Sequence, residues 1–316
     1  MDFENNIHQN MSSCMLCGRN CGANRNDGLQ RGFCNMNNIV RVARASLHMW
    51  EEPCISGING SGTVFFTGCS LKCVYCQNRS IALGNKGYDL SIDELCDTFL
   101  ELQTKGAHNI NLVTPTHYVP QIIFALSEAK RKGLSIPIVY NTGSYENLET
   151  LKMLDGYVDI YMPDIKYMDS NISQRYSNAK DYFEVASRAV AEMVRQVGEC
   201  TFEDGLMKRG VLVRHMILPG HTKDSKKIIR YLCDTYCDKI FVSIMSQYTP
   251  QPNMEQYPEI NRCITTREYN KVVDYAIELG INNAFIQDGK VSNESFIPDF
   301  DDKVFLKNSN VINKEV

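Results

Sequence analysis

The chain lacks the features that would place it on nucleic acid or in a membrane. Its 33 Lys and Arg residues do not outnumber its 37 Asp and Glu residues, and the net charge is −4. A nucleic-acid-binding domain usually carries a basic surplus. No apolar run approaches the roughly 18 residues that a membrane-spanning helix needs. The first residues, MDFENN, are polar and acidic, unlike a secretory signal. We therefore predict a cytoplasmic protein with no nucleic-acid partner and no membrane partner.

Cysteine, by contrast, is abundant, with 13 residues among 316. The odd count and a reducing compartment both argue against a disulfide framework. Seven of these cysteines fall in two clusters with metal-like spacing. The other six stand singly, and we expect them to be buried or idle thiols: Cys54, Cys96, Cys200, Cys233, Cys237 and Cys263.

One cluster, C-x3-C-x2-C, comprises Cys69, Cys73 and Cys76 and follows an apolar run at residues 63–66 that indicates a buried strand. Three thiolates can hold three corners of an iron–sulfur cube and leave the fourth iron open for chemistry. The alternative is a zinc site. Structural zinc takes four ligands in tetrahedral geometry, often from paired C-x2-C hooks, and three cysteines on one loop fit that poorly.

The other cluster lies in residues 1–60, a segment rich in Asn, Gly and Cys with little regular periodicity. Its members, spaced C-x2-C-x3-C-x12-C, are Cys14, Cys17, Cys21 and Cys34. A small module with so few core-forming residues needs an additional cross-link for stability, and a bound metal usually provides it in a reducing compartment. We predict a Cys-rich N-terminal metal-binding module over 1–60. Zinc and an Fe–S cluster both suit four thiolates, so the metal stays open.

Beyond residue 60, strand-like and helix-like segments alternate. The expected strands are 63–67, 109–113, 137–141, 158–163, 211–217, 240–246 and 283–287. The expected helices are 91–105, 119–132, 146–154, 181–197, 224–236 and 266–279. Repeated βα units predict an α/β fold with a parallel sheet and right-handed crossovers. Six or seven units predict a partial TIM-like (β/α)6 barrel over 61–295, followed by a C-terminal tail at 296–316. A full eight-strand barrel would need more strands.

The loop of Cys69, Cys73 and Cys76, with Tyr75 before its last cysteine, resembles the radical S-adenosylmethionine (SAM) superfamily. The segments YNTG at 140–143 and DIYMPDIK at 159–166 resemble those of pyruvate formate-lyase activating enzymes. The likeness extends from about Cys14 to the C-terminal strands and is nearest to an uncharacterised Fe–S branch of that family. It implies a 4Fe–4S cluster on the three cysteines, with SAM chelated by the open iron. One-electron reduction then releases a 5′-deoxyadenosyl radical.

In such barrels, functional residues come from the C-terminal ends of strands. The strand ends and the resemblance together give these candidate cofactor-binding residues: Tyr75, Thr114, Thr116, Asn141, Thr142, Met162, Asp164, Lys166 and Arg214. Many radical SAM proteins have Gly-Gly-Glu after the second strand, where this chain has TPTH at 114–117. Thr114 and Thr116 could accept the hydrogen bond from the methionyl amine. His117 is either a substrate-side acid or base or a structural histidine.

The resemblance also implies a monovalent cation beside the SAM carboxylate, surrounded by Asn141, Thr142, Met162 and Asp164. Lys166 could supply positive charge to the same group. The alternatives are a helix N-cap for Asp164 and a solvated surface position for Lys166. Arg214 lies in an apolar strand, so it must face a polar cavity, and we expect it to reach a SAM or substrate carboxylate.

Strand alternation sends His215 to the opposite side from Arg214, so a structural role is expected for it. Glu51 and Glu52 precede a proline, and a solvated turn is expected there.

The predicted function is that of a radical SAM oxidoreductase that uses a flavodoxin or ferredoxin as reductant. Glycyl-radical activation of a partner enzyme is the implied reaction. The alternatives are radical modification of a small molecule or another peptide, and a non-enzymatic Fe–S or zinc module that binds a partner.

Overall fold

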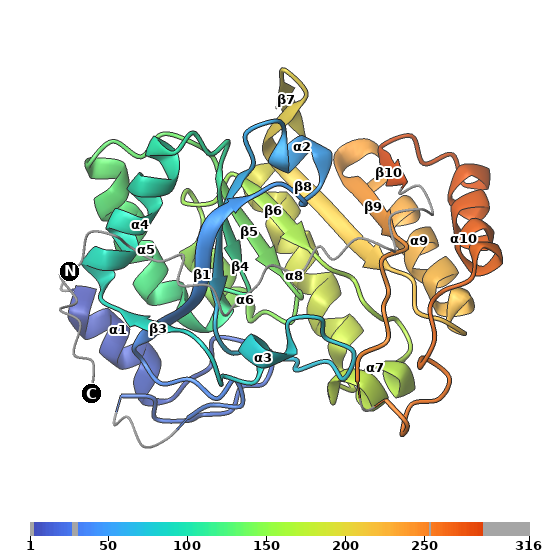
Figure 1. The fold of residues 1–316 in the computed structure, drawn as a ribbon, viewed down its shortest axis with the longest axis horizontal. Coiled ribbons are helices and arrows are strands. Elements are labelled where there is room, and N and C mark those ends of the chain that lie inside the picture. Colours follow the sequence, from blue (N-terminus) through green and yellow to red (C-terminus); the bar gives the residue numbers. More distant parts are fainter. Residues whose placement is uncertain (1–2, 27–30, 253, 287–316) are drawn as a thin grey trace, which may run out of the picture.

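The computed structural model describes residues 3–26, 31–252 and 254–286. Its strands form a sheet in the order β10-β9-β8-β6-β5-β4-β2-β1-β3, with β7 paired to β8 outside this path (Figure 1). Their bounds are β1 Val40–His48, β2 Ser61–Phe66, β3 Tyr88–Leu90, β4 Ile110–Val113, β5 Ile138–Thr142, β6 Ile160–Pro163, β7 Thr201–Glu203, β8 Leu206–Met216, β9 Phe241–Met245 and β10 Ala284–Ile286. From β2 to β10 neighbouring strands along the path are parallel. Within the described residues, the two ends of the path, β3 and β10, do not pair with each other, so the sheet that they form is open. The predicted partial TIM-like barrel is confirmed.

Helices precede or connect the parallel strands. They are α1 Phe3–Ser12, α2 Pro53–Ser56, α3 Arg79–Ala82, α4 Ile92–Thr104, α5 Val119–Arg131, α6 Leu148–Met153, α7 Ser170–Ser177, α8 Tyr182–Val197, α9 Thr222–Tyr236 and α10 Thr266–Glu278, with short 3-10 turns at Thr116–Tyr118 and Cys237–Lys239. A capping box starts α4: the Ser91 hydroxyl accepts from the Glu94 amide, and the Glu94 carboxylate accepts from the Ser91 amide. Thr265 and Glu268 start α10 in the same way. The six helices expected from the sequence are all present.

Alternate residues of each parallel strand face two different environments. Tyr140 and Val213 point into the main core against the helices. Their neighbours Val139 and Leu212 join a smaller apolar cluster on the opposite face, to which α2 contributes Ile55. Because side chains alternate along a strand, Asn141 and Arg214 share this second face with Val139 and Leu212. The site described below therefore lies on the concave side of the sheet, above an apolar floor.

Strand β1 was not expected from the sequence. It pairs antiparallel with β2 and carries an irregularity between Val42 and Arg44, which interrupts the alternation of apolar residues. Figure 1 shows β1 and α2, in blue, in front of the green and yellow strands. Residues 40–56 thus lie in the predicted N-terminal module but pack on the barrel sheet. The division at residue 60 stays a prediction, and the predicted tail 296–316 lies outside the described residues.

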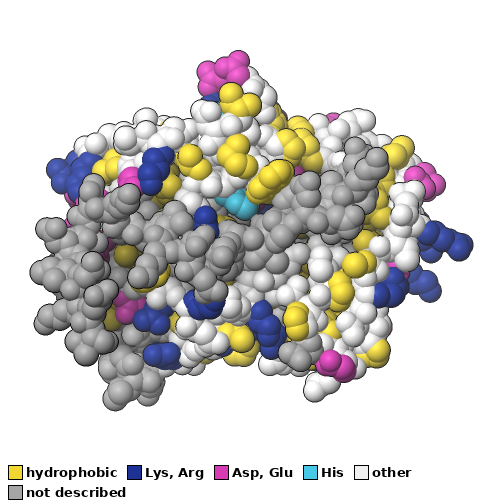
Figure 2. Space-filling view, in the orientation of Figure 1, with side chains coloured by type: hydrophobic (Ala, Val, Ile, Leu, Met, Phe, Trp, Pro, Cys, Tyr) yellow, Lys and Arg dark blue, Asp and Glu magenta, His cyan; other side chains and the backbone are white. Residues whose placement is uncertain are grey.

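On the face seen in Figure 2, acidic and basic side chains of the described residues are both present. Figure 2 shows acidic side chains at the tip of the β7 projection and hydrophobic side chains below it. Ile58, after α2, is 88% exposed. Within the described ranges, no helix combines the length and apolar content required to cross a bilayer.

Candidate active site

The loop after β2 carries Cys69, Cys73 and Cys76 to the wall of a cavity of about 260 Å³. Gly68 enters this loop with φ +93°, and a Cβ there would lie 2.9 Å from the carbonyl oxygen of Cys34. Only glycine fits such a position without displacing the neighbouring chain. Burial, reinforced by the other two thiols, raises the pKa of Cys76 to about 12. Burial also raises the pKa of Cys69, so a bound metal cation would favour the thiolate form of Cys69 and Cys76.

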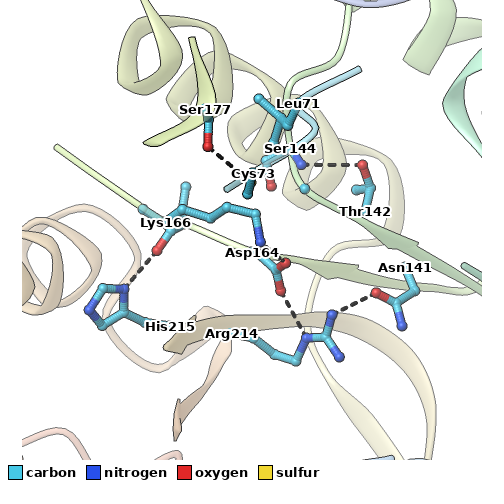
Figure 3. Close-up of polar contacts among 12 residues, drawn as sticks. Leu71, Cys73, Asn141, Thr142, Ser144, Asp164, Lys166, Ser177, Arg214 and His215 are labelled. Atoms are coloured by element: carbon cyan, nitrogen blue, oxygen red, sulfur yellow. Dashed lines mark hydrogen bonds and ion pairs between the residues drawn. The ribbon is translucent and has the colours of Figure 1, made fainter. Parts of the chain in front are cut away.

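Two donors point at the sulfurs of this loop. The amide of Leu71 donates to Cys69 Sγ at 3.3 Å. The Ser177 hydroxyl donates to Cys73 Sγ at 2.9 Å (Figure 3). Ser177 is in turn bonded to the Tyr167 hydroxyl at 2.7 Å, and Tyr167 to the Tyr75 hydroxyl at 2.6 Å. With Ser177 donating to sulfur, each tyrosine donates to the next hydroxyl oxygen. Donors of this kind orient metal ligands and stabilise negative charge on them.

The cavity collects eight of the nine residues expected to bind cofactor. They are Tyr75, Thr114, Thr116, Asn141, Thr142, Asp164, Lys166 and Arg214. The exception is Met162, whose side chain is fully buried in the apolar floor with Ile160 and Leu212. Strand alternation explains the difference, because Met162 lies on the concave face but one level below the cavity.

A network of opposite charges forms the base of the cavity (Figure 3). Arg214 donates from Nε to Asp164 Oδ1 at 3.0 Å and from Nη2 to Asn141 Oδ1 at 2.7 Å. Lys166 Nζ lies 2.6 Å from Asp164 Oδ2. Burial alone would raise the pKa of Asp164, but the Arg214 and Lys166 cations outweigh burial and hold that pKa below its ordinary value. Both oxygens of this carboxylate are therefore occupied by cations of the chain itself. Asp164 is not a helix N-cap, because it follows β6 and precedes no helix directly.

Glu51 and Glu52 were expected in a solvated turn, and this expectation is wrong. The Glu51 side chain is 9% exposed, lines the cavity and lies 3.4 Å from Arg214 Nη1. It also accepts from Asn111 Nδ2 at 3.0 Å. Glu52 accepts from the Ser243 hydroxyl at 2.7 Å. Burial raises the pKa of both carboxyls. The sequence reading missed them because their partners lie on β4, β8 and β9, far away along the chain.

Glu146, after β5, was also missed. Its carboxylate is 2% exposed and accepts from the Thr116 hydroxyl at 2.7 Å, from the Thr142 hydroxyl, and from the Tyr140 hydroxyl at 3.4 Å. Burial raises its pKa to about 7. Since Thr116 and Thr142 give their hydrogens to Glu146, each has only lone pairs left for a partner in the cavity.

Thr114 carries the backbone strain of the site. It has φ +57°, which is rare for a β-branched residue, and its amide donates to the Asn141 carbonyl at 2.8 Å. Strained residues of this kind are concentrated at functional sites.

The two histidines lie behind the cavity. His117 Nε2 is 2.7 Å from the Thr67 carbonyl, and His215 Nδ1 is 2.7 Å from the Ile165 carbonyl. Neither lines the cavity. Burial lowers the pKa of His117 to about 3 and that of His215 to about 4, so both rings are neutral at pH 7.

The N-terminal cysteines lie apart from the cavity. Cys14 and Cys34 are buried, Cys17 is partly buried and Cys21 is exposed. Among the residues that the structure describes, no group of three or more His, Cys, Asp or Glu side chains is arranged to hold a metal ion. Neither cysteine set is therefore arranged around an ion in this structure.

Comparison with known proteins gives the class of this protein. The family model described as "Radical SAM superfamily" matches residues 63–232, and the chain belongs to that superfamily. An uncharacterized protein of Methanocaldococcus jannaschii is 28% identical over 87% of this chain and 78% of its own length. The pyruvate formate-lyase-activating enzyme of Staphylococcus aureus is 19% identical over 58% of this chain and 73% of its own length.

Among solved structures, SuiB of Streptococcus suis bound to S-adenosylmethionine aligns with a TM-score of 0.48 at 14% identity. The alignment covers 70% of this chain and 48% of SuiB, so the chain matches about half of that protein's length.

Membership of the superfamily implies a 4Fe–4S cluster and SAM as cofactors. The residues present fit this pair. Three soft thiols with two hydrogen-bond donors suit an Fe–S cluster. The adjoining cavity offers cations from β8 and the segment after β6, and acceptor oxygens from β5 and the segment after β4, which match a methionyl carboxylate and a methionyl ammonium.

Proposed function

We propose that this chain is a radical SAM oxidoreductase that reductively cleaves SAM at a 4Fe–4S cluster held by Cys69, Cys73 and Cys76. The observation that carries the proposal is that these thiols share one cavity with charged and polar side chains from the ends of β4, β5, β6 and β8. When bound there, the cluster would supply the one electron for reductive cleavage of SAM, and the adenosyl fragment would abstract a hydrogen atom from the substrate.

The chain's own residues position SAM. In this proposal Arg214 and Lys166 face the methionyl carboxylate, because they are the cations that line the cavity. Thr116 and Thr142 accept from the methionyl ammonium, with Glu146 holding both hydroxyls in the acceptor orientation. Thr114 adds an acceptor beside Thr116. Tyr75 closes the cavity next to Cys76 and helps to exclude water.

A monovalent cation beside Asn141, Thr142, Met162 and Asp164 has less support than cationic side chains in the same role. Asp164 already accepts from Arg214 and Lys166, and the Asn141 oxygen accepts from Arg214. We therefore assign the positive charge near the SAM carboxylate to the two side chains. If so, SAM cleavage should proceed equally in sodium, potassium and tetramethylammonium buffers.

The substrate proposal has two candidates. Glycyl-radical activation of a partner enzyme is supported by the name of the Staphylococcus aureus relative, a pyruvate formate-lyase-activating enzyme. Radical modification of a small molecule is supported by a different observation. His48, at the end of β1, and Trp50 and Glu51, before α2, line the cavity, and side chains on this side would restrict the entry of a protein loop.

A size-fractionated extract of the source cells separates the two candidates. Stimulation of 5′-deoxyadenosine formation by the high-mass fraction, together with a glycyl radical signal at low temperature, supports activation of a partner. Stimulation by the low-mass fraction supports a small substrate. A flavodoxin or ferredoxin is proposed as reductant, and each can replace dithionite in the same assay.

The proposal is tested by SAM cleavage itself. Protein purified without oxygen and reconstituted with iron and sulfide should convert SAM to 5′-deoxyadenosine and methionine after reduction. A non-enzymatic Fe–S or zinc module would hold a saturated metal and leave SAM intact. Protein that shows the reduced cluster by EPR but yields no 5′-deoxyadenosine would overturn the proposal.

A further inference from the structure

Arg25 is a buried cation with no carboxylate partner in the part of the chain that the structure describes. Its side chain is 0% exposed. Its guanidinium donates to the carbonyls of Met36 at 3.1 Å, Asn37 at 2.6 Å and His117 at 2.7 Å. Nη1 also lies 3.6 Å from Cys14 Sγ, and the guanidinium carbon lies 5.7 Å from the centre of the Tyr118 ring. Carbonyl oxygens and an aromatic ring carry no full negative charge, so this cation has no counter-ion among the described residues, and a buried charge without a counter-ion is costly.

Two of the four N-terminal cysteines lie at this cation, and the other two interact with or border that pair. Cys14 contacts it directly, and Cys34 interacts with it electrostatically. The sulfurs of Cys21 and Cys34 each lie 3.4 Å from the point where a Cβ on Gly32 would stand, so they border the same small space. Cys17 in turn interacts electrostatically with Cys14 and Cys34. A turn fixes the segment, with the Gly22 amide donating to the Cys14 carbonyl at 3.0 Å.

We propose that Cys14, Cys17, Cys21 and Cys34 hold a second, closed thiolate metal centre and that Arg25 is its buried counter-ion. Metal uptake releases the thiol protons to solvent, and four thiolates around zinc or an Fe–S cluster carry a net negative charge. That negative charge would compensate the positive charge of the Arg25 guanidinium. Since no three candidate ligands among the described residues enclose an ion as they stand, the thiols must rotate toward each other on binding.

The second centre would also support the loop of the first. The Arg19 guanidinium donates to the Ser70 carbonyl at 2.7 Å, inside the loop of Cys69, Cys73 and Cys76. The carbonyl of Cys34 packs against Gly68 at the start of that loop. Arg25 holds the His117 carbonyl, and the His117 ring is bonded to Thr67. The N-terminal centre thus braces the backbone from Thr67 to Ser70 without lining the cavity.

Metal content is measured in a chain that lacks the first site. The variant Cys69→Ala/Cys73→Ala/Cys76→Ala removes the loop thiols and leaves the N-terminal set. After anoxic reconstitution with either zinc or iron plus sulfide, it should retain zinc or an Fe–S cluster, and adding Cys14→Ser and Cys17→Ser should reduce that metal at least about tenfold. Zinc and iron assays with absorption spectroscopy distinguish the two metals. A metal-free triple variant, or metal that survives the added serines, would overturn the second centre whatever the fate of SAM cleavage.

The counter-ion role has its own pair of variants. Arg25→Met keeps much of the volume but removes the charge, and Arg25→Lys keeps the charge. In competition with a chelator, Arg25→Met should lose metal at a chelator concentration about 10-fold or more below that for the parent chain. Arg25→Lys should recover most of the difference. Equal metal retention in Arg25→Met contradicts the assignment. If Arg25→Met fails to fold, Arg25→Lys decides, because metal loss as severe as in Cys14→Ser would show that charge is not what Arg25 contributes.

Discussion

The two cysteine-rich segments differ in what surrounds their thiols. Cys69, Cys73 and Cys76 border a cavity of about 260 Å³ whose other walls carry carboxylates, cations and hydroxyls. Cys14 and Cys34 are buried around a guanidinium, and neither lines that cavity. Cavity access leaves room for a cosubstrate on the metal, whereas enclosure by protein does not.

The difference in surroundings suggests different roles for the two sets of cysteine thiols. A cluster with three protein thiols beside a cavity is suited to chemistry on a bound molecule, and four thiols of which two lie at a buried cation are suited to stabilising a fold. The two sites meet at the backbone from Thr67 to Ser70, so damage to one should reach the other through structure rather than through shared ligands.

The largest effect on activity is expected from substitution of the loop thiols. Cys73→Ala should lower 5′-deoxyadenosine formation about a thousandfold or more, since it removes a member of a set that acts as a unit. Chromatography of the nucleoside product measures the rate. Cys263→Ala, an exposed thiol outside both sets, is the control and should retain full activity. Undiminished cleavage by Cys73→Ala would remove the chemical task from this loop.

The charged network should matter for SAM binding. Arg214→Met removes the guanidinium that pairs with Asp164 and Glu51, and we expect affinity for S-adenosylhomocysteine to fall about 10- to 100-fold, the value of one charge-assisted hydrogen bond. Affinity for 5′-methylthioadenosine, which has no carboxylate, should change less than threefold. Calorimetry measures both ligands.

Arg188→Met, on the exposed side of α8, is the matched control for Arg214→Met. An equal loss of affinity for both nucleosides would mean that Arg214 shapes the cavity rather than meeting a carboxylate.

The sequence predicted most of the parallel sheet, because short segments rich in apolar residues, such as 109–113 and 158–163, alternate with helical segments and so fit a βα repeat. It did not predict β1, whose apolar residues alternate with Arg41 and Arg44 and are interrupted by the irregularity near Val42. Pairing with β2 and β3 stabilises β1, and such pairing is not visible in a local pattern.

In the candidate site, too, some residues were predicted from the sequence and others were not. The strand-end rule and the family motifs located residues that line the cavity, such as Asp164 and Arg214. They did not locate Glu51, Glu146 or Ser177, because the role of each depends on partners 60, 30 and 104 residues away in sequence. Long-range hydrogen bonds leave no periodic signal. Whether the cavity residues bind SAM as assigned stays a prediction.

The pH dependence of unfolding tests the role of His215, which lies behind the cavity. Burial lowers the pKa of His215 to about 4 from 6.5, so the folded state binds fewer protons than the unfolded state between these values. Stability is then fully present above pH 6.5 and is lost as the pH falls through about 4, by about 3 kcal/mol in all. Urea unfolding at pH 7 and pH 4.5 measures the free energy of unfolding, and its decrease between these pH values should be smaller in His215→Asn than in the parent chain.

Ser187→Ala gives the control, since the hydroxyl it removes does not titrate between pH 7 and pH 4.5 and the pH dependence of unfolding should stay as in the parent chain. A His215→Asn curve parallel to that of the parent chain at both pH values would show that His215 does not carry the acid sensitivity.

The finest distinction between the sites concerns the donors to sulfur. Ser177→Ala removes the hydroxyl that donates to Cys73 Sγ, and a donor of this kind stabilises the more negative, reduced cluster. The midpoint potential should therefore move to a more negative value, by up to about 60 mV, which corresponds to one tenfold step for a one-electron couple. Reductive titration followed by EPR measures the shift. Tyr167→Phe, which keeps Ser177 but removes its partner, should give a smaller shift in the same direction. Ser187→Ala, on α8, should give none. An unmoved potential in Ser177→Ala would mean that this hydroxyl orients the loop without tuning its electrostatics, and the two cysteine sites would then differ in access alone.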